Sequence, residues 1–205
     1  MIENIHWLGH DTFKIVVGKQ IIYTDPFKIK NEDIASIILI THEHHDHCSP
    51  EDLLKIQGPD TAIVAPADCT SKLKGKVRTI KPGDSVEIHG IKIEAVPAYN
   101  TNKQFHTRDR GWVGYIVTLN GQRIYIAGDT DRIPEMKNFR ADIALLPVSG
   151  TYVMTADEAA AAALDIRPKI AVPMHYGSIV GTKDDAVRFA ELLKGKIDVK
   201  ILQAE

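Results

Sequence analysis

The sequence predicts an α+β fold in which two packed β-sheets are covered by helices. Short β-rich runs, separated by turn signals, make up most of the 205 residues. Only three segments carry the start signals of a helix, and two of these lie in the last third of the chain. Many strands with few, late helices are typical of two sheets that pack face to face. Because no linker or low-complexity stretch divides the chain, we expect one domain over residues 1–205.

The strands are predicted from turns and from apolar runs. Three pairs of β-rich runs are joined by two or three residues and predict hairpins: 13–17 with 20–24, 86–88 with 91–96, and 112–119 with 123–127. Asn120-Gly121 is the strongest of these turn signals, because both central positions of a type I′ turn need positive φ. Four further runs barely alternate and so indicate buried strands: 35–40, 61–65, 143–146 and 170–172.

The three helices are predicted from their first turns. Ser49 precedes a proline and two acidic residues, which is the pattern of an N-cap followed by the first helical position. Thr155 starts a capping box, and the alanine-rich helix after it should end before Pro168. Thr182 opens a third helix with one apolar face, and we expect it to end by Gly195.

Composition and charge exclude several classes of protein. The 25 Lys and Arg against 27 Asp and Glu give a net charge of -2, so we do not expect bulk nucleic-acid binding. Aliphatic strings such as Ile37–Ile40 are far shorter than the ~18 residues of a membrane span, and no secretory signal is visible. Cys48 and Cys69 resemble no disulfide framework and should be small buried residues. We therefore expect a cytoplasmic protein without a membrane partner.

The histidines are concentrated in one segment. Four of the nine lie within six residues: His42, His44, His45 and His47. This segment follows the apolar run 35–40 and precedes the first predicted helix, so it forms a loop at the carboxyl end of a strand, where sites are common. Imidazoles and carboxylates bind Zn, Mn, Fe and Ni. A tight loop can direct His42 and His44 to one ion and Asp46 and His47 to a second.

Other candidate ligands lie at the ends of other predicted strands. Asp129 and His175 each follow a β-rich run, and His106 lies in a polar loop. Gly128 allows the backbone before Asp129 to come close to its neighbours. The run that ends at Asp25 is similar to the run that ends at Asp129, which suggests two related halves. Each residue alone is a weak signal, but with the histidine segment they form a coherent set.

The pattern His42-x-His44-x-Asp46-His47, with Gly128-Asp129 and a late His175, resembles the metallo-β-lactamase superfamily of metal-dependent hydrolases. Five further segments resemble its branch of compact, uncharacterised hydrolases related to L-ascorbate-6-phosphate lactonase: 8–15, 23–27, 127–131, 146–154 and 173–177. The resemblance covers essentially the whole chain. It implies a four-layer αββα sandwich of two mixed sheets flanked by helices, with the site along one edge of both sheets.

This resemblance also implies two divalent metal ions, Zn, Mn or Ni. The implied ligands are His42, His44 and one later histidine for the first ion, Asp46, His47 and His175 for the second, and Asp129 between the two. Relatives often carry the later histidine where this chain has Asn100. We expect His106 to take that place, because imidazole is the better ligand for these metals. If neither His106 nor Asn100 binds the first ion, we expect a site with a single metal ion.

Four residues near the motif keep two interpretations each. His10 recurs in this branch near the active site, where it contacts substrate or a metal-bound water, or else it is structural. Asp25 and Asp131 either support a ligand histidine or only form turns. His45 is either exposed or supports a ligand.

The implied reaction is hydrolysis of a small anionic ester, lactone or phosphodiester by a metal-bound hydroxide. Asp129 would orient this nucleophile and Asp46 would accept its proton, so Asp46, Asp129 and His10 are the catalytic candidates. Lys103, Arg108 and Arg110 are candidate contacts for a phosphate or carboxylate of the substrate; the alternative is a solvated loop.

Two other functions fit the sequence. The first is a non-catalytic metal- or ligand-binding protein with the same fold. The second is a nuclease-type phosphodiesterase, for which the basic run 72–81 offers a contact, although a strand's solvated face explains that run as well. β-Lactamase activity itself is not expected, because those enzymes are typically exported.

Overall fold

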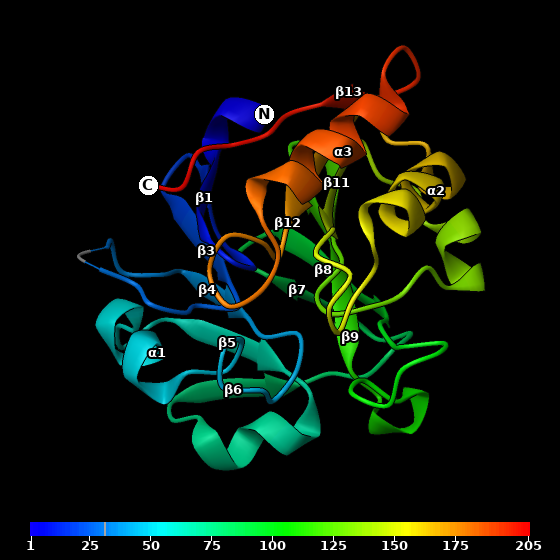
Figure 1. Cartoon of the computed structure of the whole chain (residues 1–205). Helices are drawn as coiled ribbons and strands as arrows, with labels where there is room; N and C mark the ends of the chain where they lie inside the picture. Colours follow the sequence, from blue (N-terminus) through cyan, green and yellow to red (C-terminus); the bar gives the residue numbers. More distant parts are fainter. Residues whose placement is uncertain (31) are drawn as a thin grey trace.

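Two β-sheets pack face to face and carry helices on their outer faces in the computed structural model, which describes residues 1–30 and 32–205 (Figure 1). The strands of the first sheet, in spatial order, are β1 (Ile5–Gly9), β2 (Thr12–Val17), β3 (Gln20–Thr24), β4 (Ile37–Leu39), β5 (Ala62–Ala65) and β6 (Lys76–Thr79). The strands of the second sheet, from one edge to the other, are β7 (Ser85–Ile88), β8 (Ile91–Pro97), β9 (Val113–Leu119), β10 (Gln122–Ile126), β11 (Ile143–Pro147), β12 (Ile170–Met174) and β13 (Asp198–Val199).

The helices occupy the two outer layers. Helix α1 (Pro50–Ile56) lies against the first sheet, and α2 (Ala156–Ile166) and α3 (Lys183–Leu193) lie against the second (Figure 1). Four short 3-10 helices complete the described structure: η1 (Ile2–Asn4), η2 (Ala67–Lys72), η3 (Arg108–Arg110) and η4 (Pro134–Asn138). The predicted αββα sandwich is confirmed.

Each sheet changes from antiparallel to parallel pairing at one strand. In the first sheet β3 pairs antiparallel with β2 and parallel with β4. In the second, β10 pairs antiparallel with β9 and parallel with β11. Asp25 directly follows β3, and Asp129 lies three residues after the end of β10. The likeness of these two segments in the sequence therefore reflects the same place in two similarly built sheets.

Local signals account for most of the elements. All three predicted hairpins form, and Asn120 and Gly121 both have positive φ, +49° and +77°. The capping box of Thr155 and the N-cap of Ser49 are present as predicted. Strand β4 is shorter than the predicted run 35–40, because the N–H of Ala35 donates to a carbonyl of α1 instead of to the sheet. Strands β1 and β13 were not predicted as strands, while β6 falls in the basic run 72–81 that was interpreted as the solvated face of a strand.

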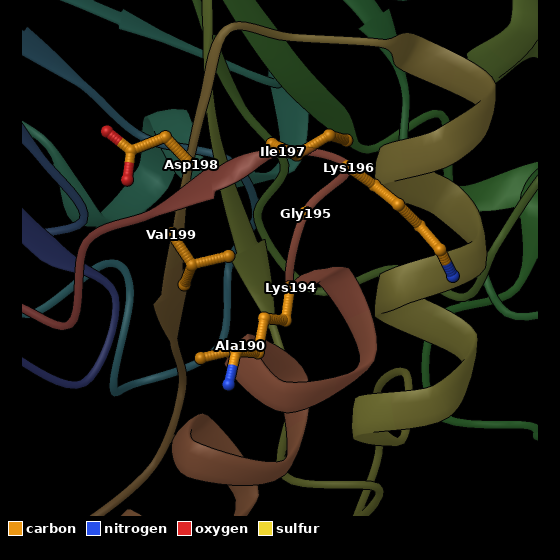
Figure 2. Close-up of a pocket in the computed structure, with 7 residues that line it drawn as sticks. All are labelled: Ala190, Lys194, Gly195, Lys196, Ile197, Asp198 and Val199. Carbon is orange, nitrogen blue, oxygen red and sulfur yellow. The ribbon is translucent and has the colours of Figure 1, made fainter.

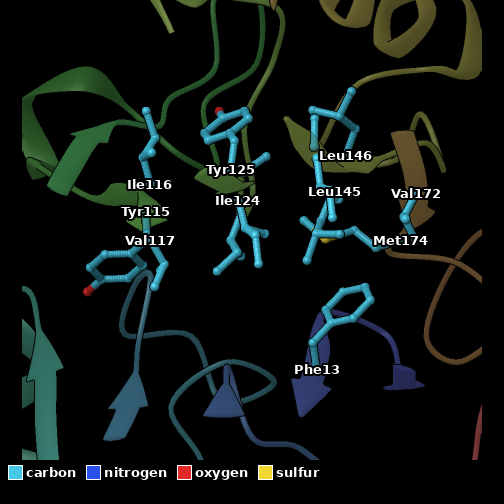
Figure 3. Packing of buried hydrophobic residues seen from close by; sticks show 14 of the residues in the cluster. Phe13, Tyr115, Ile116, Val117, Ile124, Tyr125, Leu145, Leu146, Val172 and Met174 are labelled. Carbon is cyan, nitrogen blue, oxygen red and sulfur yellow. The ribbon is translucent and has the colours of Figure 1, made fainter. Parts of the chain in front are cut away.

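The first sheet divides the buried apolar residues into two clusters, and the residues of β4 contribute to both. Ile37 and Leu39 belong to the large cluster between the sheets, while Ile38 and Ile40 belong to a smaller cluster with α1. Alternate residues of a strand point to opposite faces, so a run of four aliphatic residues fills both layers. Figure 3 shows Phe13 of the first sheet next to side chains of the second, including Met174.

None of the helices in the described part of the chain is long and apolar enough to cross a membrane. Cys48 and Cys69 are free and buried, as expected.

Candidate metal centre

The predicted site residues come together where strands of both sheets end. His10 follows β1, the segment 42–47 follows β4, Asp129 follows β10 and His175 follows β12. His106 reaches the same place from the loop between β8 and β9. Because neighbouring parallel strands end at the same edge of a sheet, residues far apart in the sequence meet in one centre.

Asp129 lies between two sets of histidines. Its Oδ2 atom is 3.1 Å from Nε2 of His106. Its Oδ1 atom is 3.4 Å from Nε2 of His47 and 3.3 Å from Nε2 of His175. His42, His44 and His106 place one ring nitrogen each within 4.8 Å of the others and form the first set. His47 and His175, which face Oδ1 of Asp129, form the second set. The two oxygens of one carboxylate thus face different sets.

These distances fit a divalent metal ion. Ligand atoms bound at 2.0–2.2 Å to a tetrahedral ion are about 3.3–3.6 Å apart, close to the separations around Asp129. Nε2 of His47, Nε2 of His106 and Oδ1 of Asp129 are among the buried atoms there that have no hydrogen-bond partner within the described residues. Buried polar atoms are normally paired, so a cation between them supplies what the chain itself does not.

In the second set, a hydrogen bond to Nδ1 of each histidine orients its ring. Nδ1 of His47 is 2.8 Å from Oδ2 of Asp25, and Nδ1 of His175 is 2.9 Å from Oγ of Ser149. Asp25 is held in turn by the N–H and the hydroxyl of Thr41. In each ring Nε2 is therefore left for the centre. Of the two interpretations of Asp25, the supporting contact to a histidine is the one observed.

A similar chain of contacts holds the first set. Nδ1 of His106 is 3.1 Å from Oδ1 of Asn100, and the backbone N–H of His106 donates to the same oxygen. The amide of Asn100 donates to Asp131. Asn100 thus orients His106, and Asp131 orients Asn100 rather than any histidine directly. His42 is oriented by Thr41, whose hydroxyl oxygen is 3.0 Å from Nδ1 of its ring.

Trp112 packs against all three histidines of the first set. Its ring centroid lies 4.8 Å from that of His42, 4.9 Å from that of His44 and 5.5 Å from that of His106. The indole nitrogen donates to Asp68 at 2.6 Å. Sequence reasoning gave Trp112 no role in the site, because nothing in the order of residues links it to the histidine segment.

Asp46 and His10 form a pair at the side of the second set. Nε2 of His10 is 3.1 Å from Oδ2 of Asp46, which is itself 3.8 Å from Nε2 of His47. Burial alone would raise the pKa of Asp46, but the hydrogen bond from His10 lowers it. His45, in contrast, is 83% exposed; its Nδ1 lies 3.5 Å from Oδ1 of Asp46, and its ring lies edge to face with Phe27.

Asp11 is a residue of the centre that the sequence reasoning missed. It is 1% exposed, and both of its oxygens lack a hydrogen-bond partner among the described residues. One oxygen lies within 4.8 Å of ligand atoms of Asp129 and His175. The available signal was a carboxylate directly after His10 in a segment that is otherwise a strand and its turn.

The two sets differ in their protonation. Burial, together with the neighbouring His47, holds the pKa of His42 well below its usual range, and burial also lowers the pKa of His44. Burial opposes the charge on His47 as well, but Asp129 and Asp25 outweigh it and raise the pKa of His47. The pKa of His175 is raised to about 9 against burial, by Asp129 and Asp11.

The backbone around the centre is tightly constrained. His10, Asp25 and His175 all have positive φ, between +41° and +59°, which non-glycine residues rarely adopt. Gly128 has a φ of +62°, and a Cβ there would lie 2.8 Å from the Thr41 side chain. The close approach predicted for Gly128 is therefore present, and it brings Asp129 next to the loop after β4.

The three predicted substrate contacts already have partners on their own loop or nearby. Lys103 forms an ion pair with the buried Asp131, and Arg108 pairs with Glu135 at 3.0 Å. Arg110 lies 5.4 Å above the ring of Trp112, next to the first set.

An exposed aromatic pair adjoins this loop. Phe105 and Tyr152 are 55% and 37% exposed and meet edge to face at 4.6 Å. A separate hollow lies between α3 and β13, lined by Ala190 and residues 194–199 (Figure 2). It shares no lining residue with the histidine sets and offers a single carboxylate, so it has no comparable chemistry.

Comparisons with known proteins agree with this architecture. Residues 4–175 match the model of a β-lactamase superfamily domain. The chain is 35% identical to a UPF0173 metal-dependent hydrolase of Thermoplasma acidophilum, over 93% of this chain and 92% of that one. A proposed metal-dependent hydrolase from Parabacteroides distasonis, of known structure, shares 42% identity and a TM-score of 0.88, over 97% and 93% of the two chains.

A more distant structure supports the fold alone. It is a proposed zinc-dependent hydrolase of the metallo-β-lactamase superfamily from Thermotoga maritima, with a TM-score of 0.68 and 21% identity over 97% of both chains. The chain therefore belongs to the metallo-β-lactamase superfamily and, within it, to the UPF0173 family of metal-dependent hydrolases. The relation to L-ascorbate-6-phosphate lactonase stays a prediction.

Proposed function

We propose that this protein is a hydrolase that uses two divalent metal ions, Zn, Mn or Ni. The residues that would hold them are His42, His44 and His106 for the first ion, Asp46, His47 and His175 for the second, and Asp129 for both. The observation that carries the proposal is the position of Asp129, with one oxygen 3.1 Å from His106 and the other 3.4 Å from His47. A carboxylate placed in this way suits a bridge between two ions.

The chain's own residues would position the reactants. When bound, two such ions lower the pKa of a water towards about 7 and polarise the substrate oxygen that gains charge. Asp129 would orient the attacking water, and Oδ2 of Asp46 would accept its proton. His10, 3.1 Å from that oxygen, would hold Asp46 in place for this step.

The substrate class is inferred from the loop beside the first set. Arg110, over Trp112, adds positive charge close to His42 and His44, which supports a small anionic ester, lactone or phosphodiester. Lys103 and Arg108 lie on the same loop, where an anionic substrate would compete for them with their carboxylate partners Asp131 and Glu135. Phe105 and Tyr152 offer an apolar surface for the uncharged part of such a substrate. We expect the protein to act in the cytoplasm.

A pair of matched variants tests the proposal. His47→Ala removes a buried histidine whose Nε2 faces Asp129, whereas His45→Ala removes its exposed neighbour two residues away. Both are assayed on phosphodiester and lactone panels with Mn²⁺, Zn²⁺ and Ni²⁺. We expect His47→Ala to lose metal-dependent turnover and His45→Ala to keep it. Turnover that survives His47→Ala, or a wild-type protein that binds metal without hydrolysing any substrate, would instead favour a non-catalytic binding protein.

A further inference from the structure

Asp11 has no part in the ligand set proposed above, although its carboxylate lies inside the centre. The side chain is 1% exposed, and neither oxygen has a hydrogen-bond partner among the described residues. A carboxylate that leaves water without gaining hydrogen bonds is strongly disfavoured, so buried carboxylates are normally paired or bound to a metal. The structure thus maintains a costly group at a defined position.

The turn between β1 and β2 holds Asp11 in that position. The backbone carbonyl of Asp11 accepts a hydrogen bond from the Thr24 hydroxyl at 3.1 Å. The neighbouring carbonyl of His10 accepts from the N–H of His175 at 3.1 Å, which ties the turn to the end of β12. The carboxylate is therefore fixed relative to a histidine of the second set and does not reach the centre by chance.

The surroundings of the carboxylate consist of candidate ligands. One oxygen of Asp11, one of Asp129 and a ring nitrogen of His175 lie within 4.8 Å of one another. Oδ2 of Asp11 is 3.9 Å from Nδ1 of His47, whose hydrogen bond goes to Asp25 instead. Asp11 thus faces the second set and not the histidines around Trp112.

We propose that Asp11 supplies a carboxylate oxygen to the second metal ion, beside Asp129 and His175. This inference rests on the proposed function, because it requires that the centre binds metal. It also makes the second set richer in carboxylates than the first, and carboxylates suit Mn²⁺ better than imidazoles do. Mn²⁺ is therefore the probe for the test.

The experiment compares Asp11→Asn with the wild-type chain by equilibrium dialysis against Mn²⁺, followed by elemental analysis. Two variants serve as references. His106→Ala should lose the first ion and keep the second. Asp52→Asn changes another buried aspartate, whose oxygens accept from the backbone N–H groups of Lys28 and Ile29 and not from a histidine, and this variant should bind both ions.

The expected result is one Mn²⁺ per chain for Asp11→Asn, with the Kd of the second ion raised by more than about 100-fold, beyond the ~10–100-fold typical of a supporting contact. A Kd of the second ion raised by less than that would overturn the proposal. A wild-type chain that binds no Mn²⁺ under any condition would overturn the proposed function first, and the two failures are thereby distinguished.

Thermal unfolding gives a second, independent reading. Without metal, Asp11→Asn removes an unpaired buried carboxylate, so its Tm should equal or exceed that of the wild type. With Mn²⁺, its Tm gain should be smaller. Asp52→Asn should lower Tm to the same extent with and without Mn²⁺. If Asp11→Asn behaves like Asp52→Asn, Asp11 has only a structural role.

Discussion

The two halves of the candidate centre are built in different ways. The first set consists of three imidazoles packed around the indole of Trp112, and its supporting contacts are amides and hydroxyls. The second set is surrounded by carboxylates: Asp11, Asp25, Asp46 and Asp129. The first set is therefore held mainly by aromatic packing, whereas the second is held mainly by contacts with carboxylates.

This difference has a consequence for the metal-free protein. Burial and the charge of neighbouring histidines disfavour the protonated form, and the pKa values of His42 and His44 are lowered. Neighbouring carboxylates favour the protonated form, and His47 and His175 have raised pKa values. His42 and His44 thus favour the neutral form that binds a cation, while His47 and His175 favour the protonated form, which must lose a proton before it binds one. Variants and pH should affect the two sets separately, except at Asp129.

The largest effect should come from Asp129, which the two sets share. We expect Asp129→Ala to bind neither ion tightly and to lower kcat/KM by more than about 10³-fold, since two ions contribute several kcal/mol to transition-state stabilisation. Elemental analysis and steady-state kinetics measure the two effects. If one ion stayed bound with unchanged affinity, Asp129 would belong to a single set.

Asp25 and Asn100 should separate the two sets. Asp25→Asn weakens the support of His47, and Asn100→Ala removes the support of His106. Loss of such a contact typically costs about 10–100-fold in metal affinity. Each variant should show this loss for one ion only, as measured by calorimetric titration. Equal losses for both ions in both variants would mean that the two sets act as one unit.

Local signals predicted most of the helices and strands and pointed to the histidine segment, while the four-layer sandwich and the assignment of ligands to two ions came from the resemblance to the metallo-β-lactamase superfamily. Turn residues such as Asn120-Gly121 and caps such as Ser49 act over a few residues, and the spacing from His42 to His47 lies within one loop. The support of a ligand histidine by Asp25 could be suggested because Asp25 directly follows a predicted strand, whereas Asn100 was considered only as an alternative ligand to His106. Trp112 and Asp11 could not be suggested, since their roles depend on which strand ends meet across the two sheets.

Metal affinity should depend on pH at the second set. The proton on His175, with a pKa of about 9, must leave before its ring can bind a cation. His47, whose pKa is also raised, must lose a proton as well, so the affinity for the second ion should rise by up to about a hundredfold per pH unit while both rings are protonated, and should keep rising at least to about pH 9. Calorimetry in buffers of different ionisation enthalpy would detect the released protons. The first ion should release fewer protons near pH 7 than the second, because the pKa values of His42 and His44 are lowered, and a larger release on its binding would contradict the comparison.

The smallest effects should come from the basic residues of the loop. Arg110→Gln should raise KM for an anionic substrate by roughly tenfold with little change in kcat, because a charged hydrogen bond contributes about 1.5–3 kcal/mol. Arg108→Gln should have a smaller effect, since Arg108 is 72% exposed and pairs with Glu135. The KM for an uncharged substrate should not change in either variant. A fall in kcat with unchanged KM would show that Arg110 supports the first set rather than the substrate.

The central claim is that one chain holds two divalent ions on either side of Asp129. The most direct measurement is elemental analysis of the purified protein after loading with Mn²⁺, Zn²⁺ or Ni²⁺ and removal of free metal. We predict two ions per chain, and one per chain for His106→Ala. One ion in the wild type that persists in His106→Ala would leave the first set without a metal, and no bound ion would contradict the account as a whole.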